Sequence, residues 1–287
     1  MEGFVDVGAG RVWYESAGAG PTVLLLHGGP GASSDYLQPI MRVANQGFRV
    51  VRYDQLGSFH SDKPEDPELW QVPRFVEEVE IVRSALNLGK VHLIGQSWGS
   101  FLALEYALTH SHGLASLVLY SGAASTRQCV AGMNKLRSEL PADDREMLTS
   151  YENAGETNAP EYLRVVDKLL KAHLLRIDPW PAWYRECFSR TAAPVFETMW
   201  GPNEFTCAGN LRDWDRTRDL GRVTVPTLVL CGRYDEVIPE CSETLAAGIP
   251  GAELHIFEES SHHAHLEQPE EFYRVLENFL ARHRQIM

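Results

Sequence analysis

The chain has 287 residues, of which 44% are hydrophobic, and its 39 acidic and 26 Lys or Arg side chains give a formal net charge of −13. This length and hydrophobic content suffice for a substantial core, in one large domain with an insertion or in two small domains. The negative charge argues against a nucleic-acid or anionic-membrane partner, because both require a cationic protein surface.

The beginning of the chain and its cysteines favour a cytoplasmic protein. Residues 1–11 contain no apolar run and so do not resemble a signal peptide, and the aliphatic run at 23–26 is far too short to span a bilayer. The five cysteines are scattered and lack metal-ligand spacing; they are Cys129, Cys187, Cys207, Cys231 and Cys241. We expect reduced thiols and no bound metal.

Short apolar runs recur along the chain, with helical patterns between them. They occupy residues 23–26, 48–53, 91–94, 114–120, 226–231 and 253–257. This alternation predicts a mostly parallel sheet with helices on both faces. Residues 11–15 alternate between apolar and polar side chains, which predicts an antiparallel edge strand ahead of the first run. The sheet should therefore be mixed.

Three segments between or after these runs have the pattern of helices. Residues 75–86 and 272–280 carry apolar side chains at helical spacing and predict amphipathic helices. Residues 98–108 are apolar almost all round, as expected of a helix buried between the sheet and its neighbours.

The strand pattern disappears over residues 123–222, which are rich in aromatic side chains and helical patterns. Several prolines divide this segment into short pieces, because proline lacks the amide donor that a helix interior needs. We predict that residues 123–222 form an inserted helical cap on an α/β core made of residues 1–122 and 223–287.

A glycine-flanked serine lies where a strand should meet a helix. Gly-Gln-Ser-Trp-Gly at 95–99 matches the G-x-S-x-G motif of α/β hydrolases and stands directly between the run at 91–94 and the buried helix. In that turn the serine has a strained backbone, and the flanking glycines let neighbouring chain pass. The free amides at the start of the helix favour negative charge there. We predict that Ser97 is a nucleophile.

A serine hydroxyl becomes reactive only when a base, oriented by a carboxylate, removes its proton. Asp235 follows the run at 226–231, and His262, His263 and His265 follow the run at 253–257. The resulting chain order of Ser, Asp and His is that of α/β hydrolases. Each candidate lies beyond the end of a strand, where open α/β sheets place their sites. Chain order alone does not choose among the three histidines.

The segment His-Gly-Gly-Pro-Gly at 27–31 follows the first central strand, where this fold supplies an oxyanion donor from a backbone amide. The side-by-side glycines Gly28 and Gly29 permit a close approach to substrate. We expect the amides of Gly29 and Trp98 to form the oxyanion hole.

Taken together, these motifs resemble the proline iminopeptidase family of α/β hydrolases, which includes the tricorn-interacting aminopeptidase factor and the prolinamide hydrolases. The resemblance covers nearly the whole chain. Its markers are residues 27–31, Tyr-Asp-Gln-Leu-Gly at 53–57, the serine turn, Gly-Pro-Asn-Glu-Phe at 201–205, residues 232–239 and Ser-Ser-His at 260–262. General esterases lack the marker at 201–205.

The resemblance implies roles for particular residues. In the family the base follows a pair of small residues, which here identifies His262. The family also holds the free α-amine of its substrate with acidic side chains, and the matching positions are Glu204 and Glu236. The implied activity is release of an N-terminal residue, proline or a small or hydrophobic one, from short peptides or amino-acid amides through an acyl-enzyme and without a cofactor.

The sequence departs from the family after Gly57, where Ser-Phe-His-Ser at 58–61 replaces a turn that more usually contains glycine and arginine. This loop borders the oxyanion region. We expect Phe59 to narrow or reshape the pocket for the acyl group.

Two other functions use the same residues. A small-molecule carboxylesterase or carbon–carbon bond hydrolase would need the same triad, and the cap carboxylates would then be incidental. A ligand-binding receptor would keep the fold and turn over slowly or not at all. A requirement for a free amine in the substrate would distinguish the aminopeptidase from the esterase or carbon–carbon bond hydrolase. Labelling of Ser97 by a fluorophosphonate would distinguish an active hydrolase from the receptor.

Overall fold

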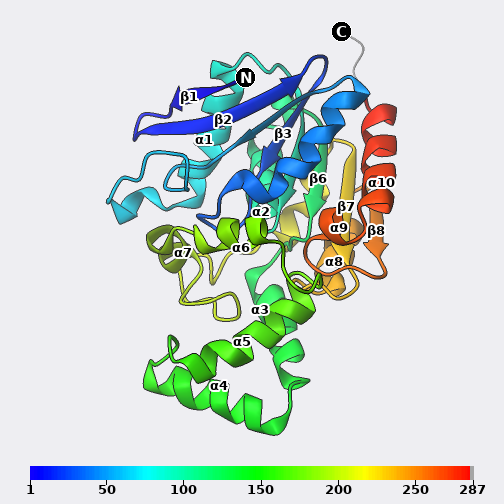
Figure 1. The fold of residues 1–287 in the computed structure, drawn as a ribbon. Helices are drawn as coiled ribbons and strands as arrows, with labels where there is room; N and C mark the ends of the chain where they lie inside the picture. Colours follow the sequence, from blue (N-terminus) through cyan, green and yellow to red (C-terminus); the bar gives the residue numbers. More distant parts are fainter. Residues whose placement is uncertain (285–287) are drawn as a thin grey trace.

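A sheet of eight strands runs through the computed structural model, which describes residues 1–284 (Figure 1). The strands stand in the order β1-β2-β4-β3-β5-β6-β7-β8. Their bounds are β1 Glu2–Asp6, β2 Arg11–Gly18, β3 Thr22–Leu26, β4 Arg49–Tyr53, β5 Val91–Gln96, β6 Leu114–Tyr120, β7 Thr227–Gly232 and β8 Glu253–Phe257. Neighbours from β4 to β8 are parallel, whereas β2 is antiparallel to β1 and β4. The predicted mixed, mostly parallel sheet is confirmed.

The first strand corrects one prediction. We expected residues 11–15 to form the edge strand, but they lie in β2, and β1 pairs with β2 on its outer side. Within β1 only Val5 is buried, so this strand has no apolar run that the sequence could reveal. It forms because the chain turns back tightly, with the Val7 amide donating to the Gly10 carbonyl at 2.9 Å.

The four central strands β3, β5, β6 and β7 are buried along their whole length, which explains why each is a continuous apolar run. Leu24 and Leu26 pack in one apolar cluster, and their neighbours Val23 and Leu25 pack in another on the opposite face. Helices cover both faces.

The helices that cover the first face are α1 Val72–Ala85, α2 Trp98–Thr109 and α8 Pro239–Gly248. Those on the second face are the 3₁₀ helix η1 Ser34–Gln46, α9 Ala264–Glu267 and α10 Pro269–Arg282. The helices predicted at 75–86, 98–108 and 272–280 thus correspond to α1, α2 and α10.

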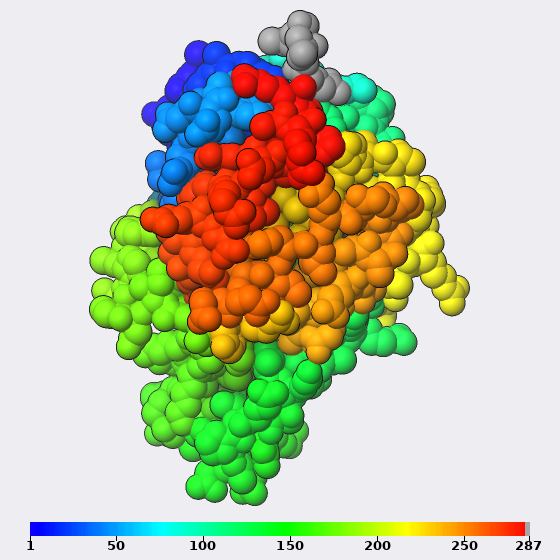
Figure 2. All heavy atoms as spheres, turned by 90° about the vertical axis from the view of Figure 1, so that its right-hand side faces the viewer, coloured from blue at the N-terminus to red at the C-terminus, as the bar shows by residue number. Residues whose placement is uncertain are grey.

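Five α-helices lie between β6 and β7, beyond the end at which β6 finishes (Figure 1). They are α3 Thr126–Ser138, α4 Ala142–Ala154, α5 Pro160–His173, α6 Ala182–Ser189 and α7 Ala193–Met199. We call these helices and their connections the cap. Figure 2 shows the cap (green) projecting beyond the surface formed by α10 (red) and β8 (orange).

The cap joins the core through a neck of two antiparallel chain segments. Ser125 bridges Asp215, and the Arg216 amide donates to the Ala124 carbonyl at 2.7 Å. The domain boundaries at 122/123 and 222/223 stay a prediction, and residues 285–287 of the predicted core lie outside the described residues. Within residues 1–284, no helix combines the length and apolar character that crossing a membrane would need.

Candidate active site

Ser97 lies in the turn between β5 and α2 with φ 57° and ψ −126°, a conformation that costs a non-glycine residue energy. The chain is crowded on both sides of it. A Cβ atom at Gly95 would come within 2.0 Å of the Gly99 carbonyl oxygen, and one at Gly99 within 2.2 Å of the Leu26 carbonyl oxygen. The two glycines are therefore what allows the strained serine to stand at this turn.

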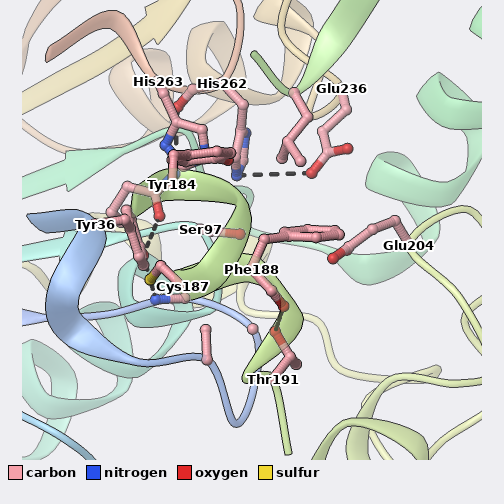
Figure 3. A pocket seen from close by; sticks show the side chains of 15 residues that line it. Tyr36, Ser97, Tyr184, Cys187, Phe188, Thr191, Glu204, Glu236, His262 and His263 are labelled. Atoms are coloured by element: carbon pink, nitrogen blue, oxygen red, sulfur yellow. Dashed lines mark hydrogen bonds and ion pairs between the residues drawn. The ribbon is translucent and has the colours of Figure 1, made fainter. Parts of the chain in front are cut away.

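Asp235 and His262 come from the loops after β7 and β8, and their side chains meet. Asp235 Oδ1 lies 2.6 Å from His262 Nδ1, and both side chains are at most 2% exposed. The same Oδ1 accepts from the Val237 amide at 2.9 Å, which fixes the carboxylate. Because Nδ1 faces the carboxylate, the other ring nitrogen, Nε2, is directed into the cavity that Ser97 also lines (Figure 3).

The structure distinguishes the three histidines of this loop. Both ring nitrogens of His265 are engaged, Nδ1 with the Tyr120 hydroxyl at 3.0 Å and Nε2 with the Tyr36 carbonyl at 2.9 Å. Burial lowers the pKa of His265 to about 4, so it stays neutral. His263 packs its ring against Tyr36 and Tyr184. Of the three, His262 is the one in contact with Asp235.

The glycine loop after β3 approaches the serine closely. A Cβ atom at Gly28 would lie 2.8 Å from the Ser97 Cβ, and Gly29 has φ 105°. The Gly28 amide donates to the Tyr36 hydroxyl at 2.6 Å, which leaves Gly29 as the amide of this pair for an oxyanion. Trp98 is the first residue of α2, so its amide has no acceptor within the helix. This geometry suits the predicted pair of donors.

Gln55 connects the two segments that carry these donors. Its side-chain amide donates to the His27 carbonyl, and its carbonyl oxygen accepts from Trp98 Nε1, both at 2.9 Å. Its backbone amide donates to His27 Nε2, also at 2.9 Å. Gln55 belongs to a marker segment of the sequence, but no sequence signal indicated which groups its side chain would join.

We expect Gln55→Leu to lower kcat roughly tenfold to a hundredfold, with a much smaller change in KM, because a misplaced oxyanion donor affects the transition state more than the bound substrate. Steady-state kinetics and a thermal unfolding midpoint would be measured together. The exposed Gln46→Leu serves as the matched control. Wild-type kcat in a folded Gln55→Leu protein would contradict the positioning role.

Two further carboxylates face the same cavity. Glu236, next to Asp235, has a side chain only 3% exposed, and its Oε1 lies 3.7 Å from His262 Nε2. Burial raises the pKa of Glu236 well above its ordinary value. Burial also raises the pKa of Glu204 in the cap to about 7. Two acids in such surroundings favour a cationic ligand, whose charge would restore their ionised forms.

A tight turn in the cap presents Glu204. The Asn203 side chain accepts from the Phe205 amide at 2.9 Å and donates to the Tyr162 hydroxyl of α5 at 2.8 Å, so the turn is tied to a helix. A Cβ atom at Gly201 would come within 2.1 Å of the Thr206 carbonyl oxygen. The marker at 201–205 is thus a turn whose shape requires these residues.

Two cavities meet at Ser97, and both carboxylates border both of them. The larger, of about 470 Å³, has a wall formed largely by Tyr36, Leu174, Tyr184, Cys187 and Phe188 (Figure 3). The smaller, of about 340 Å³, is enclosed by Trp98, Phe101, Met133, Trp200 and Leu211. The site thus combines apolar walls with a few convergent polar groups, as small-molecule sites do.

Phe59 is not among the residues that line either cavity, contrary to our expectation that it shapes the acyl pocket. Its ring instead lies beneath the Arg190 guanidinium of the cap, 4.0 Å from ring centroid to Cζ. The loop folds back because the Asp54 carboxylate accepts from the His60 amide at 2.8 Å, and the His60 ring packs on Trp13. Phe59 contacts the cap at its junction with the core.

The five cysteines are free thiols, four of them buried. Burial raises the pKa of Cys187, in the cavity wall, to about 12, which makes it a poor nucleophile. Within residues 1–284, no group of three or more His, Cys, Asp or Glu side chains is arranged to hold a metal ion.

Comparison with known proteins identifies the family. Residues 21–269 match the family described as alpha/beta hydrolase fold. The chain is 38% identical to a proline iminopeptidase of Heyndrickxia coagulans over 97% of its length and 98% of the relative's, and 37% identical to one of Saccharolobus solfataricus over 93% and 87%.

Two crystal structures are similar over almost the whole chain. The proline iminopeptidase of Mycobacterium smegmatis is 34% identical, with a TM-score of 0.92 and 99% of each chain covered. VinJ is 36% identical, with a TM-score of 0.95 and 98% of each chain covered. These matches confirm the resemblance drawn from the motifs, and this chain belongs to the proline iminopeptidase family of α/β hydrolases.

Proposed function

We propose that this protein is a serine hydrolase that releases an N-terminal proline from short peptides or amino-acid amides. The observation that carries the proposal is that Ser97, Asp235 and His262 meet two carboxylates, the buried Glu236 and the half-buried Glu204, at one cavity. Relatives 33–38% identical to the chain bear the name proline iminopeptidase, which supports the same activity.

The chemistry follows from the geometry of the triad. Asp235 holds the Nδ1–H of His262, so Nε2 takes the proton of Ser97 as the serine oxygen attacks the substrate carbonyl. The amides of Gly29 and Trp98 receive the negative charge of the tetrahedral intermediate. His262 then protonates the leaving amine, and water repeats the sequence on the acyl-enzyme to free the amino acid. The residues do this without a cofactor.

The two cavity carboxylates explain why a free N-terminus is selected. A protonated N-terminal proline carries two N–H donors and a positive charge, which matches acceptors on Glu204 and Glu236. An acetylated substrate has neither the charge nor these two donors, so it would cover both acids without giving either a cationic partner. The apolar walls suit the hydrocarbon ring.

We expect Glu204→Gln to lower kcat/KM for prolyl p-nitroanilide about a hundredfold, or about 2.7 kcal/mol, because a charge-assisted hydrogen bond to the ammonium is lost. Hydrolysis of p-nitrophenyl acetate, which has no amine, should not fall. The exposed Glu197→Gln in the same cap is the matched control. Equal losses on the two substrates would refute amine recognition by Glu204.

The alternatives are separated by one comparison. The wild-type protein would be assayed on prolyl p-nitroanilide, its N-acetyl counterpart and p-nitrophenyl acetate. A preference of about a hundredfold for the free amine supports the aminopeptidase, whereas equal rates favour an esterase-type hydrolase. A receptor without turnover would fail to react with a fluorophosphonate at Ser97.

A further inference from the structure

The imidazole of His262 lies between two carboxylates. Its Nδ1 contacts Asp235 Oδ1 at 2.6 Å, and its Nε2 lies 3.7 Å from Glu236 Oε1, the pair joined by a dashed line in Figure 3. Catalysis requires Nε2 to face the Ser97 hydroxyl. Among the hydrogen bonds of residues 1–284, none joins these two groups. The two nitrogens of the His262 ring therefore face carboxylates, Nδ1 that of Asp235 and Nε2 that of Glu236.

Three acidic side chains surround His262. Asp235 and Glu236 approach from the loop after β7, and Glu204 approaches from the cap across the shared cavity. No lysine or arginine of the described chain lines that cavity. Glu236 Oε2 and Asp235 Oδ2 are buried without a hydrogen-bond partner in this part of the protein, so acceptor capacity is left over for a cation.

The other elements packed against the ring contribute no compensating charge. The carbonyl of His173, at the end of α5, accepts from the His262 amide at 3.2 Å. From its own loop the nearest ring is His263, 5.2 Å away between centroids, and burial lowers the pKa of His263, so it is neutral. Tyr36 of η1 and Tyr184 of α6 are also neutral, because burial raises the pKa of each phenol.

We infer that the substrate's ammonium group acts as a switch as well as an anchor: by pairing with Glu236 and Glu204 it displaces the proton held on His262 and leaves Nε2 as the neutral base that activates Ser97. This inference rests on the proposed function, which places the ammonium at these two acids. One cation enters the site and one proton leaves His262 for solvent, so the charge of the site is unchanged.

The electrostatics give the direction of the switch. Burial alone lowers the pKa of His262, but the charges of Asp235, Glu236 and Glu204 outweigh it and raise the pKa to about 9. The pKa of Glu236 is raised as well, so in the empty site the pair formed by His262 and Glu236 holds a proton at neutral pH, and Nε2, which faces Glu236, cannot accept the serine proton. An ammonium beside Glu236 opposes those charges, so the pKa falls and the neutral ring is populated.

Labelling of Ser97 by a neutral fluorophosphonate tests the switch, because the reagent carries no amine of its own. Labelling rates of the wild-type protein would be measured from pH 5 to 10, with and without pyrrolidinium chloride, against sodium chloride at equal ionic strength. Pyrrolidinium has the secondary ammonium of proline and no carbonyl to attack. We expect the rate without it to rise towards an apparent pKa of about 9, and pyrrolidinium to accelerate labelling at pH 7 about tenfold, the gain for a pKa lowered by one unit.

Glu236→Gln separates the switch from simple filling of the cavity. Without the Glu236 charge, the empty site should label faster than wild type at pH 7, with its profile moved to lower pH, and pyrrolidinium should accelerate it little. Glu204→Gln should also label faster than wild type at pH 7 and respond less to pyrrolidinium, but both effects should be smaller. This second variant tests the switch if Glu236→Gln does not fold. The exposed Glu243→Gln, a matched control, should respond as wild type does.

The inference is overturned if wild-type labelling follows an ordinary histidine pKa, or if pyrrolidinium slows labelling in the wild-type and Glu236→Gln proteins alike. The outcome is separable from that of the proposed function. A strong preference for prolyl over N-acetylprolyl p-nitroanilide without acceleration by pyrrolidinium removes the switch alone. Absence of that preference removes the aminopeptidase assignment on which the switch depends.

Discussion

Replacing Ser97 by alanine is expected to lower kcat for prolyl p-nitroanilide about a millionfold, because the triad acts as a unit and loses its nucleophile. The fold should persist. Alanine keeps the Cβ atom of serine, so the backbone strain at φ 57° and the contacts of the flanking glycines stay as they are. Activity would be measured with enzyme in high excess, alongside binding of proline as the product.

Ser84→Ala on the exposed side of α1 is the control for removal of a serine hydroxyl, and it should retain wild-type kinetics. If the Ser97→Ala protein kept a substantial share of wild-type activity, another nucleophile would have to be sought. Covalent labelling followed by peptide mapping would locate it.

Replacing Asp235 by asparagine should lower kcat about ten-thousandfold, as loss of the orienting carboxylate does in serine proteases. Asparagine can present its amino group to His262 Nδ1, which favours the tautomer with the proton on Nε2, and that tautomer cannot accept the serine proton. The same Oδ1 position accepts from the Val237 amide, so that hydrogen bond is lost in this orientation, and a thermal unfolding midpoint is measured to check that the protein stays folded. The measurement is kcat as a function of pH.

The matched control is Asp213→Asn, at an exposed position of the cap. A loss of less than about tenfold in Asp235→Asn would contradict the triad. Glu236, the next residue, provides an internal contrast, because Glu236→Gln should leave Ser97 reactive towards a fluorophosphonate, whereas Asp235→Asn should not.

The central part of the fold could be predicted because buried parallel strands consist of continuous runs of apolar residues. Strands β3, β5, β6 and β7 lie where those runs are, since both of their faces are covered. Strand β1 could not be found this way. It holds its place through backbone pairing with β2, and of its side chains only Val5 is buried, so its sequence resembles that of a loop.

The sequence predicted which strand ends carry the residues of the site, but it did not predict the contacts that their side chains make. The positions of Ser97 and Asp235 follow from motif and strand order, whereas the choice of His262 over its neighbours depended on the family resemblance. The structure adds side-chain contacts, which the spacing of residues in the sequence does not reveal. Gln55 acts by joining two distant segments, and Phe59 is drawn away from the cavities by the fold of its own loop around Asp54.

The neck between cap and core has a consequence for how members of this family can diverge. Ser97, Asp235 and His262 all belong to loops at the strand ends, while Glu204 and all of the aromatic wall of the larger cavity except Tyr36 come from the insertion. Because the insertion enters and leaves through one paired bridge at Ser125 and Asp215, its length and side chains can change without shifting the register of the sheet. Substitutions in the insertion can therefore change which acyl group is preferred, while the geometry of the catalytic residues stays the same.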